Sequence, residues 1–284
     1  MLKGDTAIVT LPQPAGAGSP FEEIIQNGPI PLRLPAAGAL DQDQEWCEAE
    51  IDGVWRRIRF HDYDDLYNVP GLYETLFYRT LRCVSPTEVM ALFRTILLEH
   101  GQAPEELSAI DFGAGNGMMG ETLQAMGIRR IVGVDILPEA KQAALRDRSW
   151  VYDRYLVADM THPTEAMRCT LEMAFPNTLV TVAALGYGDI PVRAFSNAFN
   201  LIGEPGWVAF NIKERFLHGA DTTGFGGLFS EMLRRGILQV QAYKRYCHRL
   251  NIAGEPLYYV ALVAKKLEDI PTTLIDQLEE LSIR

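Results

Sequence analysis

Short apolar runs alternate with segments of helical spacing through the middle of the chain. Five runs have the length of a buried strand, and they cover residues 109–112, 131–134, 155–158, 179–184 and 207–212. Short apolar runs bounded in this way are typical of strands, and helices can fill the intervals between them. The alternation therefore predicts an α/β protein with a mostly parallel sheet and helices on both faces.

The pattern changes after Gly236. Residues 238–250 and 257–265 form two long β-like runs with only a short connection between them. A parallel pair would need a crossover of about a dozen residues or more, so these two runs must pair antiparallel. We expect the sheet to end in a β-hairpin, followed by a terminal helix over 270–284.

The first part of the chain has a different character. Residues 11–20 and 29–38 are rich in Pro, Gly and Ala, and they predict an arm or linker with little compact structure before about residue 44. The Asp52-Gly53 pair lies between two alternating runs and predicts a β-hairpin over 45–60.

Two helices are predicted before the sheet begins. Apolar spacing indicates one over 70–82, in a region rich in aromatic residues that we expect either to roof the cofactor cleft or to form plain core. The string Ser85-Pro86-Thr87-Glu88 has the form of a capping box with proline at the first helical position. Gly101 supplies the end of this second helix.

The charge and composition of the chain limit the classes of partner that it can bind. The 284 residues carry a formal net charge of −11 and an isoelectric point near 5.0, which disfavours a nucleic-acid partner. The short basic runs at 56–59 and 234–235 are typical of solvated faces. The four cysteines form no C-x-x-C pair, and no secretory or membrane-spanning apolar stretch is present, so we expect a cytoplasmic protein without a membrane partner.

The most informative string is Asp111-Phe112-Gly113-Ala114-Gly115-Asn116-Gly117, which precedes a helix predicted over 118–126. Glycines let the backbone turn sharply from strand to helix and let a ligand approach the main chain. A dinucleotide fingerprint would carry its third glycine at Met118, so an NAD-dependent oxidoreductase is disfavoured. No Gly-Lys-Ser/Thr follows, which excludes a P-loop.

This D-x-G-x-G-x-G string resembles the first motif of the class I S-adenosylmethionine-dependent methyltransferases, and the resemblance extends over about 104–267. It implies a Rossmann-like, doubly wound, mostly parallel seven-stranded sheet ending in an antiparallel β-hairpin, with S-adenosylmethionine as cofactor and S-adenosylhomocysteine as product. We expect an N-terminal arm, hairpin and helical cap over 1–103, the methyltransferase core over 104–267 and a C-terminal helix over 268–284.

The resemblance also assigns residues to the cofactor. It places Asp135 on the ribose hydroxyls, Asp159 at the adenine amino group with Met160 against the ring, and carbonyls near Ala184 at the methionine amino group. A carboxylate can accept two hydrogen bonds from a vicinal diol, although Asp135 can equally cap the next helix and Asp159 can start an ordinary turn. The full set is Asp111, Gly113, Ala114, Gly115, Asp135, Ile136, Asp159, Met160 and Ala184.

Candidate catalytic groups are less well defined. Tyr187 and Asp189 follow the predicted fourth strand of the core, where the loop would face the substrate. His248 is a further candidate because histidine titrates near neutral pH. Tyr187 can instead be a pocket wall, and His248 a satisfied polar residue on a strand face. The acidic cluster at 62–65 lacks the spacing of a metal loop, so we expect no metal.

The predicted reaction is methyl transfer to a small molecule, on oxygen, nitrogen or carbon. The acidic charge and the absence of an accessory basic domain favour a small acceptor over a macromolecule. Two alternatives stay open: a catalytically silent S-adenosylmethionine-binding subunit or scaffold, and an aminopropyltransferase-like enzyme. A homodimer is compatible with the sequence.

Overall fold

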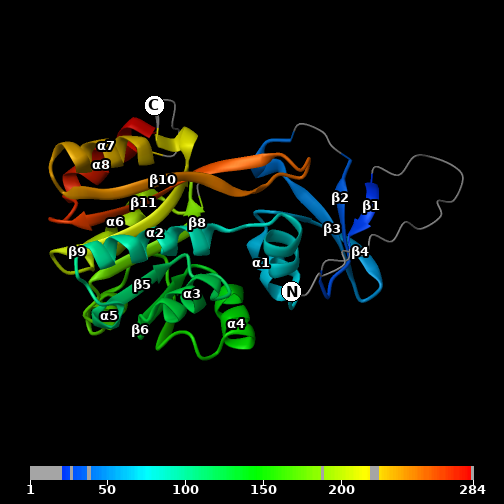
Figure 1. Cartoon of the computed structure of the whole chain (residues 1–284), viewed down its shortest axis with the longest axis horizontal. Helices are drawn as coiled ribbons and strands as arrows, with labels where there is room; N and C mark the ends of the chain where they lie inside the picture. The colour runs from blue at the N-terminus through cyan, green and yellow to red at the C-terminus, as the bar shows by residue number, and fades with distance from the viewer. Residues whose placement is uncertain (1–20, 26–27, 37–39, 187–188, 218–223, 283–284) are drawn as a thin grey trace, which may run out of the picture. The chain divides into compact units, whose positions relative to one another are not determined.

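The computed structural model describes residues 21–25, 28–36, 40–186, 189–217 and 224–282. The chain forms two compact units (Figure 1): the first comprises Met1–Val84 and Cys247–Leu257, and the second comprises Ser85–Tyr246 and Tyr258–Arg284. The division falls before α2 (Ser85–Glu99) rather than at the expected residue 103, because α2 packs on the sheet of the second unit. Among the described residues, no helix has the length and apolar character that crossing a bilayer requires.

The second unit contains a seven-stranded sheet with the order β10-β11-β9-β8-β5-β6-β7. β5 pairs in parallel with β6 and β8, as do β6 with β7 and β8 with β9, whereas β11 runs antiparallel to β9. This is the Rossmann-like α/β topology with a closing hairpin that the sequence predicts. The strands are β5 (Ser108–Phe112), β6 (Arg130–Asp135), β7 (Arg154–Val157), β8 (Thr178–Leu185), β9 (Gly206–Lys213), β10 (Leu238–Leu250) and β11 (Pro256–Lys266).

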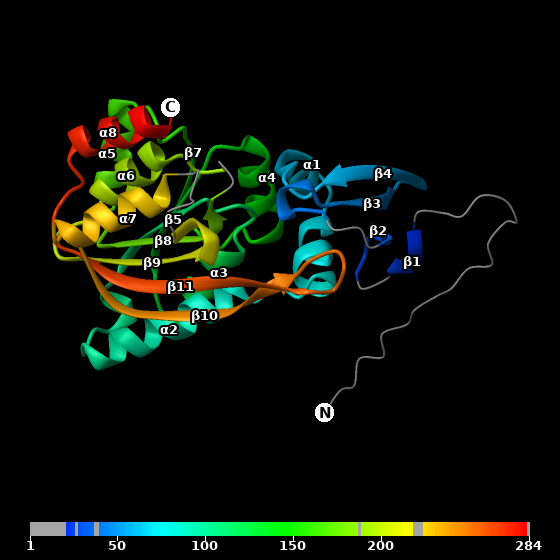
Figure 2. The same cartoon turned by 90° about the horizontal axis from the view of Figure 1, so that it is seen from above.

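Helices cover both faces of this sheet (Figure 2). One face carries α6 (Val192–Asn200), α7 (Phe225–Arg234) and α8 (Thr272–Ser282), and its core includes the aromatic group Phe195, Phe210, Phe225 and Phe229. The other face carries α2, which packs on β8 and β9, and α3 (Met118–Met126), which packs on β6 and on α2. Burying each such side chain contributes about 1.5–3 kcal/mol. The remaining helices of the unit are η3 (Pro104–Glu106), α4 (Pro138–Asp147), α5 (Glu165–Glu172) and η4 (Glu214–Leu217).

The first unit contains a four-stranded sheet with the order β1-β2-β3-β4. The predicted hairpin is confirmed: β3 (Trp46–Ile51) and β4 (Val54–Arg59) pair antiparallel around Asp52 and Gly53, which have φ of 53° and 77°. Positive φ at both positions is the requirement of the tight turn that an Asp-Gly pair predicts.

The expectation of little structure before residue 44 is wrong for part of that segment. β1 (Phe21–Ile25) pairs antiparallel with β2 (Leu32–Pro35), and β2 pairs antiparallel with β3 on its other side. Pro35 ends β2 and Pro31 precedes it, so neither proline interrupts the middle of the strand, and the Pro31 carbonyl still accepts the amide of Glu50 at 3.0 Å. Prolines at strand ends are compatible with a ladder, which composition alone did not reveal.

Helical structure in the first unit differs in detail from the prediction over 70–82. The described helices of this unit are the short 3-10 helix η1 (Gln42–Gln44), α1 (Tyr63–Asn68) and the π-helix η2 (Glu74–Thr80). The wider turn is visible where the Leu81 amide donates to Leu76 O at 2.9 Å and the Thr80 hydroxyl donates to Thr75 O at 2.8 Å. Aromatic residues of this region contact one another within the core of the unit.

The tip of the β10–β11 hairpin belongs to the first unit. Glu45 and Arg249 form an ion pair whose side chains are fully or almost fully buried, and Glu45 Oε1 also accepts the amide of Ile252 at 2.8 Å. The Leu250 amide donates to Leu81 O at 2.8 Å, and Ile252 joins the apolar core. The first unit is therefore built from two segments that are far apart in the sequence.

Candidate functional site at the carboxyl ends of the parallel strands

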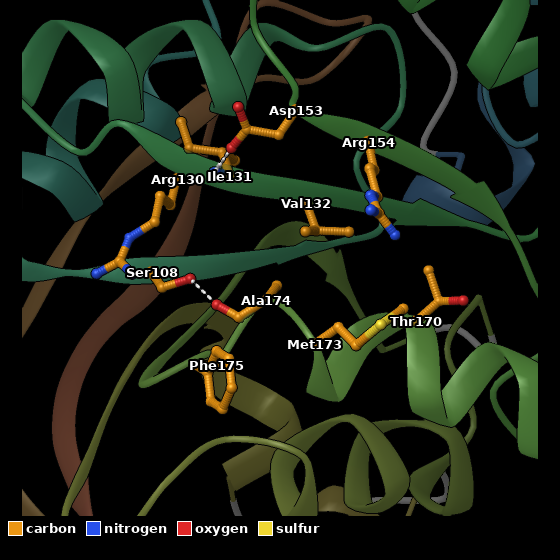
Figure 3. A pocket seen from close by; sticks show the side chains of 10 residues that line it. All are labelled: Ser108, Arg130, Ile131, Val132, Asp153, Arg154, Thr170, Met173, Ala174 and Phe175. Atoms are coloured by element: carbon orange, nitrogen blue, oxygen red, sulfur yellow. Dashed lines mark hydrogen bonds between the residues drawn. The ribbon is translucent and has the colours of Figure 1, made fainter.

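A pocket of about 300 Å³ lies at the amino ends of β5, β6 and β7 (Figure 3). Its polar groups are partly engaged: Ser108 Oγ donates to Ala174 O at 2.8 Å, and Asp153 Oδ2 accepts the amide of Ile131 at 2.9 Å. In open α/β sheets, ligands bind at the opposite, carboxyl ends of the strands. The candidate functional site therefore lies at those ends.

The glycine loop connects β5 to α3 at the carboxyl edge. Gly113, Gly115 and Gly117 all have positive φ, at 76°, 52° and 89°. The amides of Gly113 and Ala114 both donate to Val134 O, at 2.9 and 3.1 Å, which ties the loop to β6. A Cβ at Gly113 would lie only 2.8 Å from the Cβ of Ala184, so no larger residue fits between the loop and the end of β8. The loop is a close-approach turn that brings the predicted residues 113 and 184 together.

Asp135 holds the loop from the end of β6. Its Oδ2 accepts the amide of Gly115 at 2.9 Å, and its Oδ1 accepts the amide of Leu137 at 3.0 Å, just before α4. Burial raises the pKa of this carboxyl, and the amides of Leu137, Gly115 and Ile136 oppose the rise. Leu137 is the residue before α4, and within the described part of the chain α4 has no side-chain cap hydrogen bond, so this contact closes a turn between β6 and α4 and is not a helix cap. An ionised carboxylate has about four acceptor positions, and the amides of Gly115 and Leu137 use two of them.

The loop after β7 contains the next two predicted residues. Asp159 is exposed, and its Oδ1 accepts the hydroxyl and the amide of Thr161, which lower the pKa of the carboxyl in that order. Met160 is 2% exposed and belongs to the core, whereas Ile136, beside Asp135, is 59% exposed. Ile136 therefore offers the larger accessible apolar surface next to the loop.

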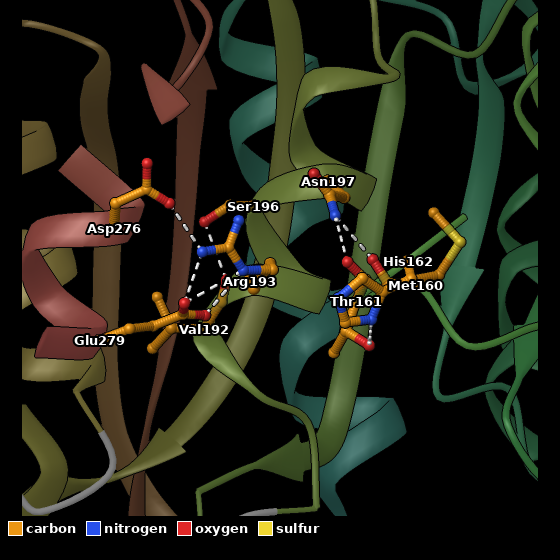
Figure 4. A network of polar contacts seen from close by, with 9 residues as sticks. All are labelled: Met160, Thr161, His162, Val192, Arg193, Ser196, Asn197, Asp276 and Glu279. Carbon is orange, nitrogen blue, oxygen red and sulfur yellow. Dashed lines mark hydrogen bonds and ion pairs between the residues drawn. The ribbon is translucent and has the colours of Figure 1, made fainter. Parts of the chain in front are cut away.

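Helix α6 fixes the loop after β7 (Figure 4). Asn197 Nδ2 donates to the carbonyls of Met160 and Thr161, at 2.8 and 3.3 Å. α6 is attached in turn to α8, because the Arg193 guanidinium donates to Asp276 at 2.8 Å and to Glu279 at 2.9 Å. The carboxyl end of β7 is thus held by side chains from outside the sheet.

Asp111 lies beneath the glycine loop and is 1% exposed. The Tyr152 hydroxyl donates to Asp111 Oδ2 at 2.6 Å. Burial raises the pKa of Asp111 to about 7; the Tyr152 hydrogen bond opposes this rise, and the charge of Asp135 adds to it. Tyr152 links Asp111 to the loop, because the same hydroxyl also lies 3.4 Å from the carbonyl oxygen of Ala114.

Three residues that sequence reasoning missed complete the support of the loop. Tyr152 binds Asp111, the Tyr155 hydroxyl donates to Gly115 O at 2.7 Å, and Arg148 Nη1 donates to Asn116 O at 3.3 Å. Buried tyrosine hydroxyls need partners, so the two tyrosines flanking the start of β7 were the available signal.

The end of β8 is irregular beside Gly113. Pairing between β8 and β9 shifts between Thr181 and Leu185, and Ala183 has a φ of 59°. The Ala183 amide donates to Asn211 Oδ1 at 2.6 Å. Asn211 was also missed, since a lone polar residue in an apolar strand carries no motif.

The two candidate catalytic residues that the structure describes, Asp189 and His248, belong to different units. Tyr187 lies outside the described residues. Asp189 is exposed in the second unit, and its amide donates to Gly186 O at 3.2 Å. His248 belongs to the first unit, where it is 5% exposed and its Nδ1 lies 3.8 Å from Cys83 Sγ. Their catalytic roles stay predictions, as do the ligand contacts of the loop residues.

No protein-family model matches the sequence, and no curated protein is significantly similar to it. Among solved structures, the chain is similar to an S-adenosylmethionine-dependent methyltransferase from Anabaena variabilis, with a TM-score of 0.49 and 14% identity over 74% of this chain and 96% of that one. It is also similar to the N-methyltransferase NodS from Bradyrhizobium japonicum in complex with S-adenosyl-L-homocysteine, with a TM-score of 0.45 and 15% identity over 64% of this chain and 87% of that one. Magnesium protoporphyrin IX methyltransferase from Synechocystis, with bound S-adenosylmethionine, gives a TM-score of 0.43 at 14% identity, with 64% and 79% covered. At these identities the likeness concerns the fold alone.

Proposed function

We propose that the second unit binds S-adenosylmethionine at the glycine loop and transfers its methyl group to a small-molecule acceptor. The observation that carries this proposal is the Asp135 carboxylate, which two amides hold at the end of β6 while acceptor positions remain for a ribose diol. Asp135 stands beside a glycine loop that leaves no space for a Cβ at residue 113. This combination fits a nucleoside better than a bare phosphate.

The other groups at this edge fit the rest of the cofactor. Exposed Ile136 can pack on the adenine ring, and the ionised Asp159 can accept its amino group. The amino-terminal end of α3 favours the carboxylate of the methionine portion. Carbonyls near Ala184 would accept its ammonium group.

When bound, the cofactor supplies an electrophilic methyl group on a sulfonium. The chain has to bind and orient the cofactor, align the acceptor and exclude water. Tyr187, Asp189 and His248 are the residues that we propose for proton removal or for orienting the acceptor. The net charge of −11 supports a small acceptor rather than a nucleic acid.

Ligand-induced thermal stabilisation tests the cofactor. S-adenosylhomocysteine should raise the melting temperature and NAD should not, since a ligand at about a hundredfold excess over its Kd contributes roughly 2.7 kcal/mol. Asp135→Asn should reduce the shift. Asp153→Asn is the matched control, because this carboxylate binds a backbone amide at the amino end of β6.

The outcomes separate the alternatives. A shift with NAD, or none with S-adenosylhomocysteine, would overturn the cofactor assignment. Binding of S-adenosylmethionine without methyl transfer to any of a broad panel of hydroxyl, amine and carbon acceptors would favour the silent subunit. A preference for decarboxylated S-adenosylmethionine would favour aminopropyl transfer.

A further inference from the structure

The end of β8 contains two residues more than its partner strand. Thr181 pairs with Phe210 and Leu185 with Ile212, so four steps along β8 correspond to two steps along β9. Ala183 lies in this bulge with a φ of 59°, in the left-handed region. A Cβ makes this conformation unfavourable for alanine, so the surrounding structure has to hold it.

Asn211 of β9 provides this hold. It is fully buried, and its Oδ1 accepts the Ala183 amide at 2.6 Å. Its Nδ2 donates to Tyr246 Oη at 2.7 Å and to Ser85 Oγ at 3.1 Å, and these two hydroxyls are themselves 2.7 Å apart. Hydroxyls from α2 and β10 thus anchor an amide on β9 that binds the bulge of β8.

The network fixes which way the Asn211 amide faces. A flipped amide would point its NH₂ group at the N–H of Ala183, so that two donors would face each other. The arrangement therefore offers the bulge an acceptor oxygen in a defined position. A buried asparagine with both ends engaged is rigid, and it specifies one local structure.

The bulge determines where Ala184 lies. The Cβ of Ala184 occupies the space that a side chain at Gly113 would need. The backbone from Ala183 to Ala184 consequently lies directly beside the glycine loop. Under the proposed function, this is the backbone that receives the amino group of the cofactor.

We propose that Asn211 is a positioning residue: without touching the ligand, it holds the β8 bulge so that the carbonyls near Ala184 meet the methionine end of S-adenosylmethionine. This inference rests on the proposed function. It assigns Asn211 to one end of the cofactor only, which a general structural role would not do.

Two ligands test that selectivity. S-adenosylhomocysteine carries the amino-acid portion, whereas 5′-methylthioadenosine has the same nucleoside without it. Asn211→Leu should weaken the binding of S-adenosylhomocysteine about tenfold, as expected for the loss of polar contacts. The same variant should weaken the binding of 5′-methylthioadenosine less than about twofold. Calorimetry measures both affinities. Adding Ala183→Gly should recover part of the lost affinity, since glycine adopts the left-handed conformation without strain.

Two further variants keep the test decisive. Val208→Ala in β9 removes buried core packing away from the bulge, and should lower stability without changing the ratio of the two affinities. Tyr246→Phe keeps the ring and removes one anchor of Asn211, so it should show a smaller loss in the same direction if Asn211→Leu does not fold.

Equal weakening of both ligands, or none, in both the Asn211 and Tyr246 variants would overturn the positioning role. Failure of the unmodified protein to bind S-adenosylhomocysteine would instead overturn the proposed function, so the two failures are distinguishable.

Discussion

Asp111 is a carboxylate buried beneath the glycine loop, and its pKa is raised to about 7 from an ordinary value of 3.8. The folded protein keeps this proton up to about pH 7, whereas the unfolded chain releases it near pH 4. The folded state thus binds more protons between these values, and its stability falls as the pH rises through them.

Asp111→Asn should remove this dependence while keeping an acceptor for the Tyr152 hydroxyl. Relative to the unmodified protein, the variant should gain about 3 kcal/mol of unfolding free energy between pH 5 and pH 8, from roughly 1.4 kcal/mol per pH unit up to the folded pKa. Urea unfolding at the two pH values measures the difference. A constant difference between the two proteins would show that Asp111 does not titrate in this range.

Gly120 gives a second prediction at this scale. In an exposed helix, Gly→Ala stabilises by about 1 kcal/mol. At Gly120 the added Cβ would lie 2.4 Å from Val151 and 2.7 Å from the Tyr152 ring, so Gly120→Ala should instead destabilise by about 1–3 kcal/mol. Gly227→Ala in α7 is the control, because it would meet only the end of the Leu278 side chain, at 3.1 Å. Equal effects in thermal unfolding would contradict the packing argument.

The residues of the candidate site differ in how well the sequence alone predicts them. Gly113 directly follows β5 and Asp135 ends β6, and both could be singled out because they match positions in the family motifs that the sequence resembles. Tyr152 and Asn211 could not, since their partners are remote: Tyr152 binds a residue 41 positions away, and Asn211 binds one 126 positions away. Only the folded topology brings these groups together.

At the scale of the elements, Arg249 at the hairpin tip forms a buried ion pair with Glu45, the residue directly before β3. Arg249→Met would leave Glu45 buried without its partner, and it should cost about 3–5 kcal/mol of stability. Replacing both residues by Met should recover most of the loss, because an apolar pair needs no compensating charge. Chemical unfolding of the single and double variants measures this. A double variant as unstable as the single one would mean that Glu45 is compensated by other groups.

Element boundaries follow from local pattern where the pattern is strong. The strands from β5 to β11 lie within one residue of their predicted ends, because β5 to β9 are distinct apolar runs and β10 and β11 are long β-like runs. β2 was missed because the prolines at its ends resemble a linker, and η2 departed from an ordinary helix through hydrogen bonds that no periodicity encodes. The sequence therefore predicts buried strands better than short, half-exposed elements.

At the scale of the whole molecule, the two units are not two consecutive segments. The first unit includes Cys247–Leu257, which lie near the carboxyl end of the chain. These residues form the tip of the β10–β11 hairpin, and the rest of this hairpin belongs to the sheet of the second unit. Any turn can join two such strands, so nothing in the sequence of the tip indicated that it enters another core. The consequence is that the folding of the first unit depends on a segment some 160 residues downstream of Val84.

Replacing Cys247–Leu257 by Asn-Gly tests this dependence. An Asn-Gly turn can close β10 onto β11, so the second unit should keep its sheet and its binding of S-adenosylhomocysteine. The first unit would lose Arg249 and Ile252 and would leave Glu45 buried without its charge partner, so its amides should exchange much faster. Hydrogen exchange by mass spectrometry should show lost protection over 46–81 and unchanged protection over 108–135. Retained protection over 46–81 would mean that the first unit is stable without the hairpin tip. Lost protection over both 46–81 and 108–135 would mean that the sheet of the second unit also requires the tip, so that the two units unfold together.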